Sequence, residues 1–171
     1  MWEEPLAPPR PSLDARDFRS ALGSFPTGVC LITTVTPDRQ RVGLTANSFS
    51  SVSLDPPMVL WSLGRTASSA PVFRDAEYFA INVLAAGDEQ LSSHFARPGA
   101  DKFALYAGRF TEGLAGVPVL QGAVAAFECH SRHRYYGGDH IIVIGRVERY
   151  AYDAGRAPLI FHRGRYAASG A

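Results

Sequence analysis

Short apolar stretches separated by turn residues make up most of this chain. Residues 29–36, 58–63 and 78–84 are rich in β-branched and aromatic side chains, a composition that predicts buried strands. Turn sequences bound them, with Pro37-Asp38 after the first and Asp55-Pro56-Pro57 before the second. The last third of the chain predicts three further strands, at about 124–135, 141–152 and 159–162, the first two joined at Gly137-Gly138-Asp139.

A few short segments have the spacing of helices. Asp14 or Ser12 can cap a first helix that runs to about residue 25. Two more are predicted at about 68–73 and, with Asp88 as its cap, at about 89–95. Many strands with few short helices predict a mainly β barrel with helical inserts, because a βαβ fold needs a long helix between successive strands. The sequence contains neither GxGxxG after a first strand nor GxxxxGK[ST], which disfavours a Rossmann or P-loop fold.

Size and composition limit the classes of protein that remain. The 171 residues fit one domain at 15–171, and we expect residues 1–14, which four prolines interrupt, to be a flexible arm. The formal net charge is +1 and the basic residues are spread along the chain, so nucleic acid is not an expected partner. No signal peptide or bilayer-length apolar run is visible, which predicts a cytoplasmic protein without a membrane partner. Cys30 and Cys129 lie in apolar strands and are expected to be buried thiols without a disulfide.

One predicted strand is unusually polar. Residues 43–53 place hydroxyl and amide side chains where a buried strand prefers Val or Ile. Two explanations are open: an exposed edge strand, or a strand whose polar groups meet a ligand.

The order of several short motifs resembles one family. These motifs are Phe25-Pro26-Thr27-Gly28-Val29, Gly43-Leu44-Thr45-Ala46-Asn47-Ser48-Phe49, Ser53-Leu54-Asp55-Pro56-Pro57, Phe79-Ala80-Ile81-Asn82-Val83-Leu84, Leu91-Ser92-Ser93-His94-Phe95-Ala96, Asp101-Lys102-Phe103, Gly138-Asp139-His140 and His162-Arg163-Gly164-Arg165-Tyr166. With these motifs in this order, the chain is similar to the flavin reductases, whose members bind FMN or FAD in a Greek-key-like split β-barrel.

The resemblance implies a function as well as a fold. It implies a homodimeric oxidoreductase that reduces FMN or FAD with NADH or NADPH and supplies reduced flavin to a separate oxygenase. Two other classes stay open: a flavin-binding electron carrier without nicotinamide chemistry, and a barrel that carries another small apolar ligand. Steady NADH oxidation with free flavin separates the reductase from the electron carrier, and bound flavin excludes the last class.

The chemistry of a flavin selects candidate binding residues. An isoalloxazine ring has a polar edge that strand N–H groups and small side chains can satisfy, a role that Thr45, Ala46, Asn47 and Ser48 fit. For the phosphate, Arg65 stands beside hydroxyls at a predicted helix start, although it can equally be an ordinary surface charge. The candidates named by the phosphate chemistry or added by the resemblance are Ser68, Ser69, Ser93, Lys102, Pro26, Thr27, Gly28 and Val29. His162 and Tyr166 are expected either to contact flavin, in their own or a partner subunit, or to pack at the barrel rim.

Among the five histidines, His140 is singled out. It follows the Gly137-Gly138-Asp139 turn and is either a polar rim residue or, as the resemblance implies, a group that positions the nicotinamide. His130 and His133 do not suggest a metal site, because residues three apart on a regular strand face opposite sides. No metal is expected.

Overall fold

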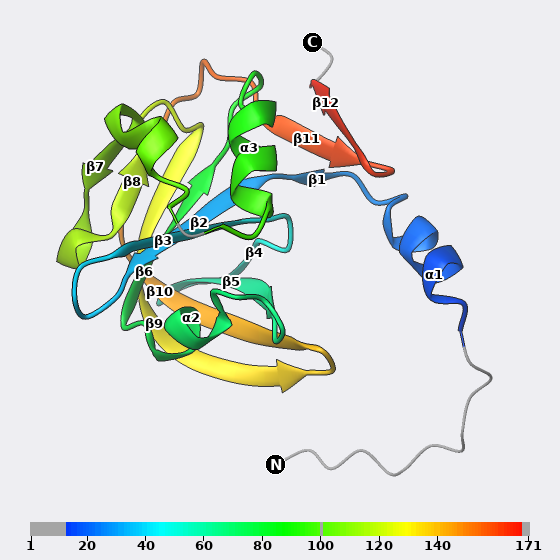
Figure 1. Cartoon of the computed structure of the whole chain (residues 1–171), viewed down its shortest axis with the longest axis horizontal. Helices are drawn as coiled ribbons and strands as arrows, with labels where there is room; N and C mark the ends of the chain where they lie inside the picture. The colour runs from blue at the N-terminus through cyan, green and yellow to red at the C-terminus, as the bar shows by residue number, and fades with distance from the viewer. Residues whose placement is uncertain (1–12, 100, 169–171) are drawn as a thin grey trace.

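The computed structural model describes residues 13–99 and 101–168, and within them one antiparallel sheet dominates (Figure 1). Its seven strands neighbour one another in an order that differs from their order in the chain. Across the sheet they are β3 (Arg41–Ala46), β2 (Cys30–Val35), β6 (Tyr78–Val83), β9 (Ala125–Gly137), β10 (His140–Tyr152), β5 (Pro57–Gly64) and β4 (Ser50–Leu54).

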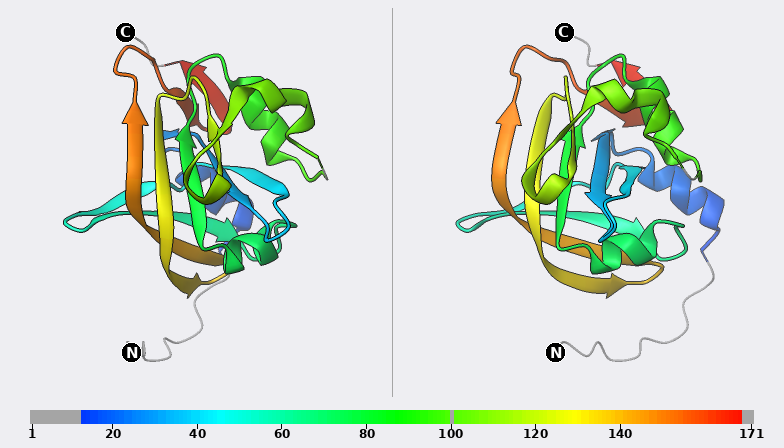
Figure 2. Two further views of the ribbon diagram at one scale, coloured as in Figure 1. Left: turned by 90° about the vertical axis from the view of Figure 1, so that its left-hand side faces the viewer. Right: turned by 60° about the vertical axis from the view of Figure 1, so that its left-hand side comes forward.

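The two edge strands of this sheet are neighbours in the chain. Residues 47–49 alone connect β3 to β4, and such a link spans at most about 14 Å. In a flat sheet, six strand spacings would separate the edges by roughly 29 Å. The sheet therefore has to roll up until its edges meet, which gives the barrel seen in Figure 2.

The barrel closes without a continuous ladder. Among the described residues, β3 pairs only with β2 and β4 pairs only with β5. A side chain bridges the gap instead: Ser48 Oγ accepts a hydrogen bond from the Ser62 backbone N–H (2.8 Å) and donates one to the Ser62 carbonyl (3.2 Å). The barrel is therefore split between β3 and β5, and the predicted mainly β split barrel is confirmed.

Smaller elements surround the large sheet or project from it. They include α3, which packs against β2 and β3 (Figure 1). These elements are α1 (Ala15–Leu22), α2 (Ala70–Asp75), α3 (Glu89–Ala96), the 3₁₀ turns η1 (Ala104–Arg109) and η2 (Leu114–Gly116), a sheet of β1 (Thr27–Gly28), β11 (Leu159–His162) and β12 (Arg165–Ala168), and the pair β7 (Phe110–Glu112) with β8 (Pro118–Leu120).

Two apolar clusters stabilise the fold. Trp61, Phe79 and other buried side chains form one, and Leu31 and Phe95 belong to the second. Alternate residues of β2 enter different clusters, so nearly all of that strand is buried. This explains why its first three residues are all apolar instead of alternating with polar ones. The hydroxyls of its buried Thr33 and Thr34 donate hydrogen bonds to the carbonyls of Pro118 and Tyr78.

Most predicted elements occur, with two differences. The polar stretch 43–53 forms parts of two strands, β3 and β4, at opposite edges of the sheet. β7, β8 and β12 were not predicted, because each has only three or four residues. Asp14 caps α1 as expected, by accepting hydrogen bonds from two backbone N–H groups, and the rest of the predicted arm lies outside the described residues.

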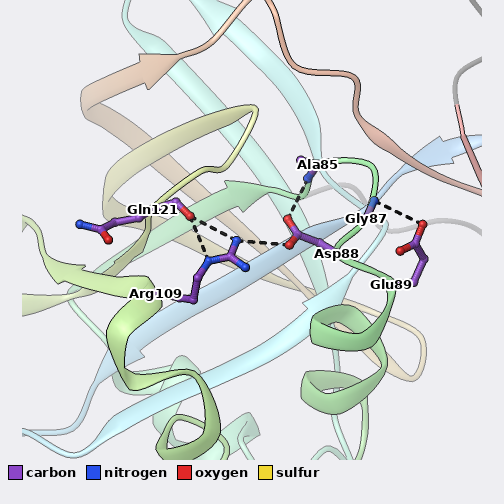
Figure 3. A network of polar contacts seen from close by, with 6 residues as sticks. All are labelled: Ala85, Gly87, Asp88, Glu89, Arg109 and Gln121. Carbon is purple, nitrogen blue, oxygen red and sulfur yellow. Dashed lines mark hydrogen bonds and ion pairs between the residues drawn. The ribbon is translucent and has the colours of Figure 1, made fainter.

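Asp88 precedes α3 but does not cap it through its side chain. The carboxylate instead accepts hydrogen bonds from the backbone N–H of Ala85 (3.1 Å) and from Arg109 Nη2 (3.2 Å), while Arg109 also donates to the carbonyl of Gln121 (Figure 3). Asp88 thus occupies the expected N-cap position, but without a side-chain hydrogen bond to the helix. Asp88 serves to join the start of α3 to the segments after β6 and before β7.

The structure also bears on the expectations about the two cysteines and about membrane-spanning segments. Cys30 and Cys129 are buried and free, and burial raises the pKa of each thiol to about 12. No helix in the described ranges is long and apolar enough to span a bilayer.

Candidate active site at the split of the barrel

A cavity of about 510 Å³ opens at the split between β3 and β5. This volume is in the range of pockets that take a drug-sized ligand or cofactor. Its walls come from four places: the end of β3 with the 47–49 link, the end of β5 with the segment before α2, the C-terminal end of α3 with Lys102, and His140. The predicted residues that line it are Thr45, Ala46, Asn47, Ser48, Ser68, Ser69, Lys102 and His140.

The β3 wall presents polar groups that the fold does not use. As an edge strand, β3 is hydrogen-bonded only to β2, so backbone groups on its other side are free of ladder partners. Thr45 donates its hydroxyl to the Ser92 carbonyl (2.7 Å), and Ser48 bridges to Ser62, whereas Asn47 is exposed. The stretch therefore forms sheet edges, as the first explanation predicted, and part of it also lines the cavity. That its polar groups meet a ligand stays a prediction.

Lys102 brings a positive charge to one end of the cavity. Its Nζ donates to the carbonyls of Phe95 (2.8 Å) and Gly43 (3.3 Å), which leaves one of three N–H donors. Both partners are neutral, and partial burial lowers the pKa of Lys102 because it penalises the charged form. An anion placed beside the ammonium would use the third donor and offset that penalty.

Hydroxyl groups surround the same end. Thr66, Ser68 and Ser69 line the cavity, and their hydroxyls make no hydrogen bond to another described residue. Ser69 precedes α2, a helix of six residues. The hydroxyls and the Lys102 ammonium together form a set of donors suited to a phosphate.

Arg65, the cation predicted to bind phosphate, does not line the cavity. Its guanidinium lies over the Tyr136 ring, 5.3 Å from the centroid, and donates to the carbonyl of Gly138 (3.4 Å). Its backbone N–H also donates to the carbonyl of Asp139 (2.9 Å). The side chain thus faces the β9–β10 hairpin, where it supports the turn before His140.

His140 stands at the other end of the cavity, where β10 begins. It pairs with Gly64 of β5, and its Nδ1 lies 2.7 Å from Oδ1 of Asp139. This hydrogen bond and the imidazole charge lower the pKa of the exposed Asp139 carboxyl. Because the carboxylate engages Nδ1, Nε2 is the ring nitrogen left for a ligand.

Seven other predicted residues lie outside the cavity wall. Pro26, Thr27, Gly28 and Val29 belong to the segment around β1, which pairs with β11. Tyr166 Oη lies 2.8 Å from Ser92 Oγ and accepts a hydrogen bond from Ser93 Oγ (3.4 Å), which fastens β12 to α3. His162 ends β11 and is half-buried. Tyr166 therefore packs at the rim of the barrel, and a contact of His162 or Tyr166 with flavin stays a prediction.

Several lining residues escaped the sequence analysis. Arg97 and Pro98 follow α3, and Ser62, Leu63 and Gly64 come from β5. The β5 residues meet the cavity because β5 pairs with β10 and faces the split, a long-range arrangement that no local pattern reveals. Arg97 directly follows the motif that ends at Ala96, and its charge before Pro98 is the one local feature that could have marked it as a site residue.

Strand β9 does not have the strict alternation of side chains on which the expectation of no metal at His130 and His133 was based. The β9–β10 register shifts so that Arg132 has no partner between Ser131 and His133. His130 stacks on Tyr78, with ring centroids 5.0 Å apart, while His133 stacks on Tyr135 at 6.0 Å. In the described ranges no group of three His, Cys, Asp or Glu side chains is placed to hold a metal ion.

Comparison with known proteins gives matches along nearly the whole chain. The family model of the flavin reductase like domain matches residues 22–170. FMN reductase (NADH) SmoA of Agrobacterium fabrum is 44% identical over 159 residues, which cover 90% of this chain and 85% of that protein. The reductase component of the flavin-dependent trigonelline monooxygenase of Acinetobacter baylyi is 44% identical over 151 residues, covering 88% of this chain and 48% of that protein.

Solved structures share the fold as well. The NADH:FAD oxidoreductase SgcE6 of Streptomyces globisporus, in complex with NAD and FAD fragments, aligns with a TM-score of 0.83 at 36% identity. The alignment covers 92% of this chain and 96% of that one.

Proposed function

The chain belongs to the flavin reductase like family, and from that membership we propose that the cavity at the split is where it reduces flavin with a nicotinamide dinucleotide. The observation that carries this proposal is one cavity with three features: a free strand edge, an unpaired ammonium at one end and His140 at the other. Bound there, the nicotinamide supplies a hydride and the flavin accepts it.

The β3 edge is proposed to hold the flavin ring. Thr45, Ala46, Asn47 and Ser48 offer backbone groups and small side chains on one side of a narrow split, which suits the polar edge of a flat ring. Leu44 and Ala67, which are half-buried, contribute apolar surface to the same cavity. The ring would thereby take the place that a ladder between β3 and β5 would otherwise occupy.

Lys102 is proposed to bind the flavin phosphate with Thr66, Ser68 and Ser69. Its remaining N–H donor and the three uncommitted hydroxyls form the donor set. A charge-assisted hydrogen bond to phosphate contributes about 1.5–3 kcal/mol, so this group decides much of the affinity for phosphorylated flavins over riboflavin.

His140 is proposed to position the nicotinamide. Asp139 fixes the ring by its hydrogen bond to Nδ1, so that Nε2 is directed to the ligand. Hydride transfer requires close approach of the two rings and no obligatory protein acid, so the contribution of His140 is orientation.

A homodimer is proposed on the exposed apolar face of α1. Phe18 and Leu22 of that helix and the following Phe25 are 50%, 60% and 75% exposed, and no residue of α1 is buried. Among residues 13–99 and 101–168 nothing covers this apolar stripe, and a second copy of the chain would cover it. Helix α1 projects from the barrel (Figure 1). It is attached at its C-terminal end, where the carbonyl of Gly23 accepts a hydrogen bond from the backbone N–H of Arg163.

A separate oxygenase is proposed to receive the reduced flavin. The support is the similarity to the reductase component of trigonelline monooxygenase, a protein of which this chain spans about half. We propose that reduced flavin leaves the split and diffuses to that second protein.

The test is NADH and NADPH consumption by the purified protein with FMN, FAD or riboflavin in excess. Steady turnover with at least one flavin is expected. Binding of flavin without any turnover would instead favour the flavin-binding electron carrier, and absence of flavin binding would overturn both functions.

A further inference from the structure

Two more cavities continue from the Lys102 end of the split. A middle cavity of about 210 Å³ shares Ser68, Ser69 and Lys102 with the cavity at the split. An outer cavity of about 510 Å³ shares Arg41 and Phe103 with the middle one. The three cavities adjoin one another through these shared residues, and we call the row of cavities the track. It starts at the phosphate end of the proposed flavin site and follows the outer part of β3.

The middle cavity has the chemistry of a phosphate site. Its wall carries two cations, Arg41 and Lys102, and two hydroxyls, and it includes no acidic residue. Arg41 is exposed at the start of β3, and within the described chain its guanidinium has no hydrogen bond or ion pair. A guanidinium suits a second phosphate because its planar donors match phosphate oxygens.

The outer cavity is wider and more mixed. Arg39, Gln40 and Arg41 form one side, and Phe103 and Ala104 lie on the other. Its acid, Asp101, is already engaged, since its carboxylate accepts hydrogen bonds from the backbone N–H groups of Phe103 (3.2 Å) and Ala104 (3.0 Å). The Arg39 guanidinium is held by the carbonyl of Ala115 (3.0 Å) and by Glu112 (3.9 Å). The volume of the cavity suits a ribose and a heteroaromatic base.

We propose that the middle and outer cavities bind the adenosine diphosphate half of FAD, with Arg41 on its second phosphate, so that this chain selects FAD over FMN. This rests on the proposed function, because the track has meaning only if the flavin occupies the split. The same chemical group occurs in nicotinamide dinucleotides. The flavin is favoured because the track opens at Lys102 and shares no residue with the Gly64 and His140 end.

Binding measurements on the intact protein test the assignment. Dissociation constants for riboflavin, FMN and FAD are measured by fluorescence titration for the wild type, for Arg41→Ala and for Arg149→Ala. Arg149 is an exposed arginine of β10 that lines none of the three cavities, so it is the matched control. We expect the wild type to bind FAD at least tenfold more tightly than FMN. Arg41→Ala should weaken FAD about tenfold and change FMN and riboflavin less than twofold, whereas Arg149→Ala should change none of them.

Other outcomes overturn the assignment in distinguishable ways. Equal losses for FMN and FAD in Arg41→Ala would place Arg41 on the first phosphate. A raised KM for NADH with unchanged FAD affinity would assign the track to the nicotinamide dinucleotide, and no change in any constant would leave it without a ligand. Each of these results leaves the proposed function standing if the wild type still reduces flavin, whereas a wild type that binds no flavin removes the proposed function itself.

Discussion

Lys102 carries a charge that no carboxylate balances among residues 13–99 and 101–168. Replacing it with Met keeps the length of the side chain and removes the charge. We expect Lys102→Met to weaken FMN binding roughly ten- to a hundredfold, the loss of about 1.5–3 kcal/mol, and to leave riboflavin binding nearly unchanged. Fluorescence titration measures both constants.

Arg65→Met is the comparison that decides which cation serves the phosphate. Because the Arg65 guanidinium lies over Tyr136, its loss should change FMN affinity much less than the loss of Lys102. A larger effect at Arg65 would restore the role that the sequence predicted for it, and equal losses of FMN and riboflavin in Lys102→Met would give Lys102 a purely structural role.

The Asp139 and His140 pair supplies a second prediction at this scale. Asp139→Asn removes the charge that holds Nδ1, so the ring should lose its fixed orientation while the cavity wall stays in place. We expect kcat/KM for NADH to fall about tenfold with flavin affinity unchanged, measured by stopped-flow reduction. The depressed pKa keeps Asp139 ionised below the ordinary range of an aspartate, so this orientation is present at neutral pH and is lost only as the pH falls through the lowered value.

A rate of reduction that Asp139→Asn leaves at the wild-type level would remove the pair from the mechanism. His140→Gln distinguishes the remaining roles, because Gln hydrogen-bonds without titrating near neutral pH. Partial rescue relative to His140→Ala and a flat pH profile indicate positioning, whereas loss equal to that of Ala indicates proton transfer.

At the scale of elements, the position of α3 decides the shape of the cavity, and its start depends on Asp88. Asp88→Ala leaves the backbone N–H of Ala85 and the Arg109 guanidinium without this acceptor in a buried place. We expect a loss of about 1–3 kcal/mol in the free energy of unfolding, measured by urea denaturation. Asp153→Ala, which breaks an exposed pair with Arg156, should cost less than about 1 kcal/mol. Equal losses in the two variants would show that the Asp88 network adds nothing beyond a surface ion pair.

The close packing of α3 on β3 also rests on one glycine. A Cβ added at Gly43 would lie 2.9 Å from Phe95 Cε1 and 3.1 Å from Phe103 Cζ. Any larger residue at this position would push α3 outward, and Lys102, which bonds to both Gly43 and Phe95, would move with it. The glycine at the start of the polar motif therefore has a packing role that the sequence alone did not show.

Local patterns predicted the strands well because each strand is specified by its own residues. β2, β6 and β11 appear where β-branched and apolar side chains gather, and the Lys102 and His140 candidates reached the cavity. Sequence could not show that residues 43–53 divide between two sheet edges, because the bend at 47–49 contains no Gly or Pro and is required by closure of the barrel, which depends on distant strands. Sequence also could not predict the orientation of the Arg65 side chain, because that orientation depends on a contact with Tyr136, which is distant in the chain.

For the whole molecule, the exposed face of α1 predicts the state of association. Light scattering after gel filtration should give a dimer for the wild type. Leu22→Glu places a charge in the middle of the apolar stripe and should produce monomers, whereas Arg16→Glu, outside the stripe, should leave the dimer intact. A monomeric wild type would contradict the proposed second copy, and dimers in every variant would place the interface elsewhere.

Because only three residues link the two edges of the sheet, the rigidity of the barrel should depend on whether a ligand occupies the split. A ligand in the split would bridge β3 and β5, whereas without one the hydrogen bonds from Ser48 of the link to Ser62 of β5 join the two sides. A reductase that releases its product flavin in each cycle therefore alternates between a more rigid, flavin-bound barrel and a looser, flavin-free one. The amide hydrogens at the open edge of β3 should exchange with solvent faster in the looser state, so exchange protection of that single strand reports how long the flavin stays.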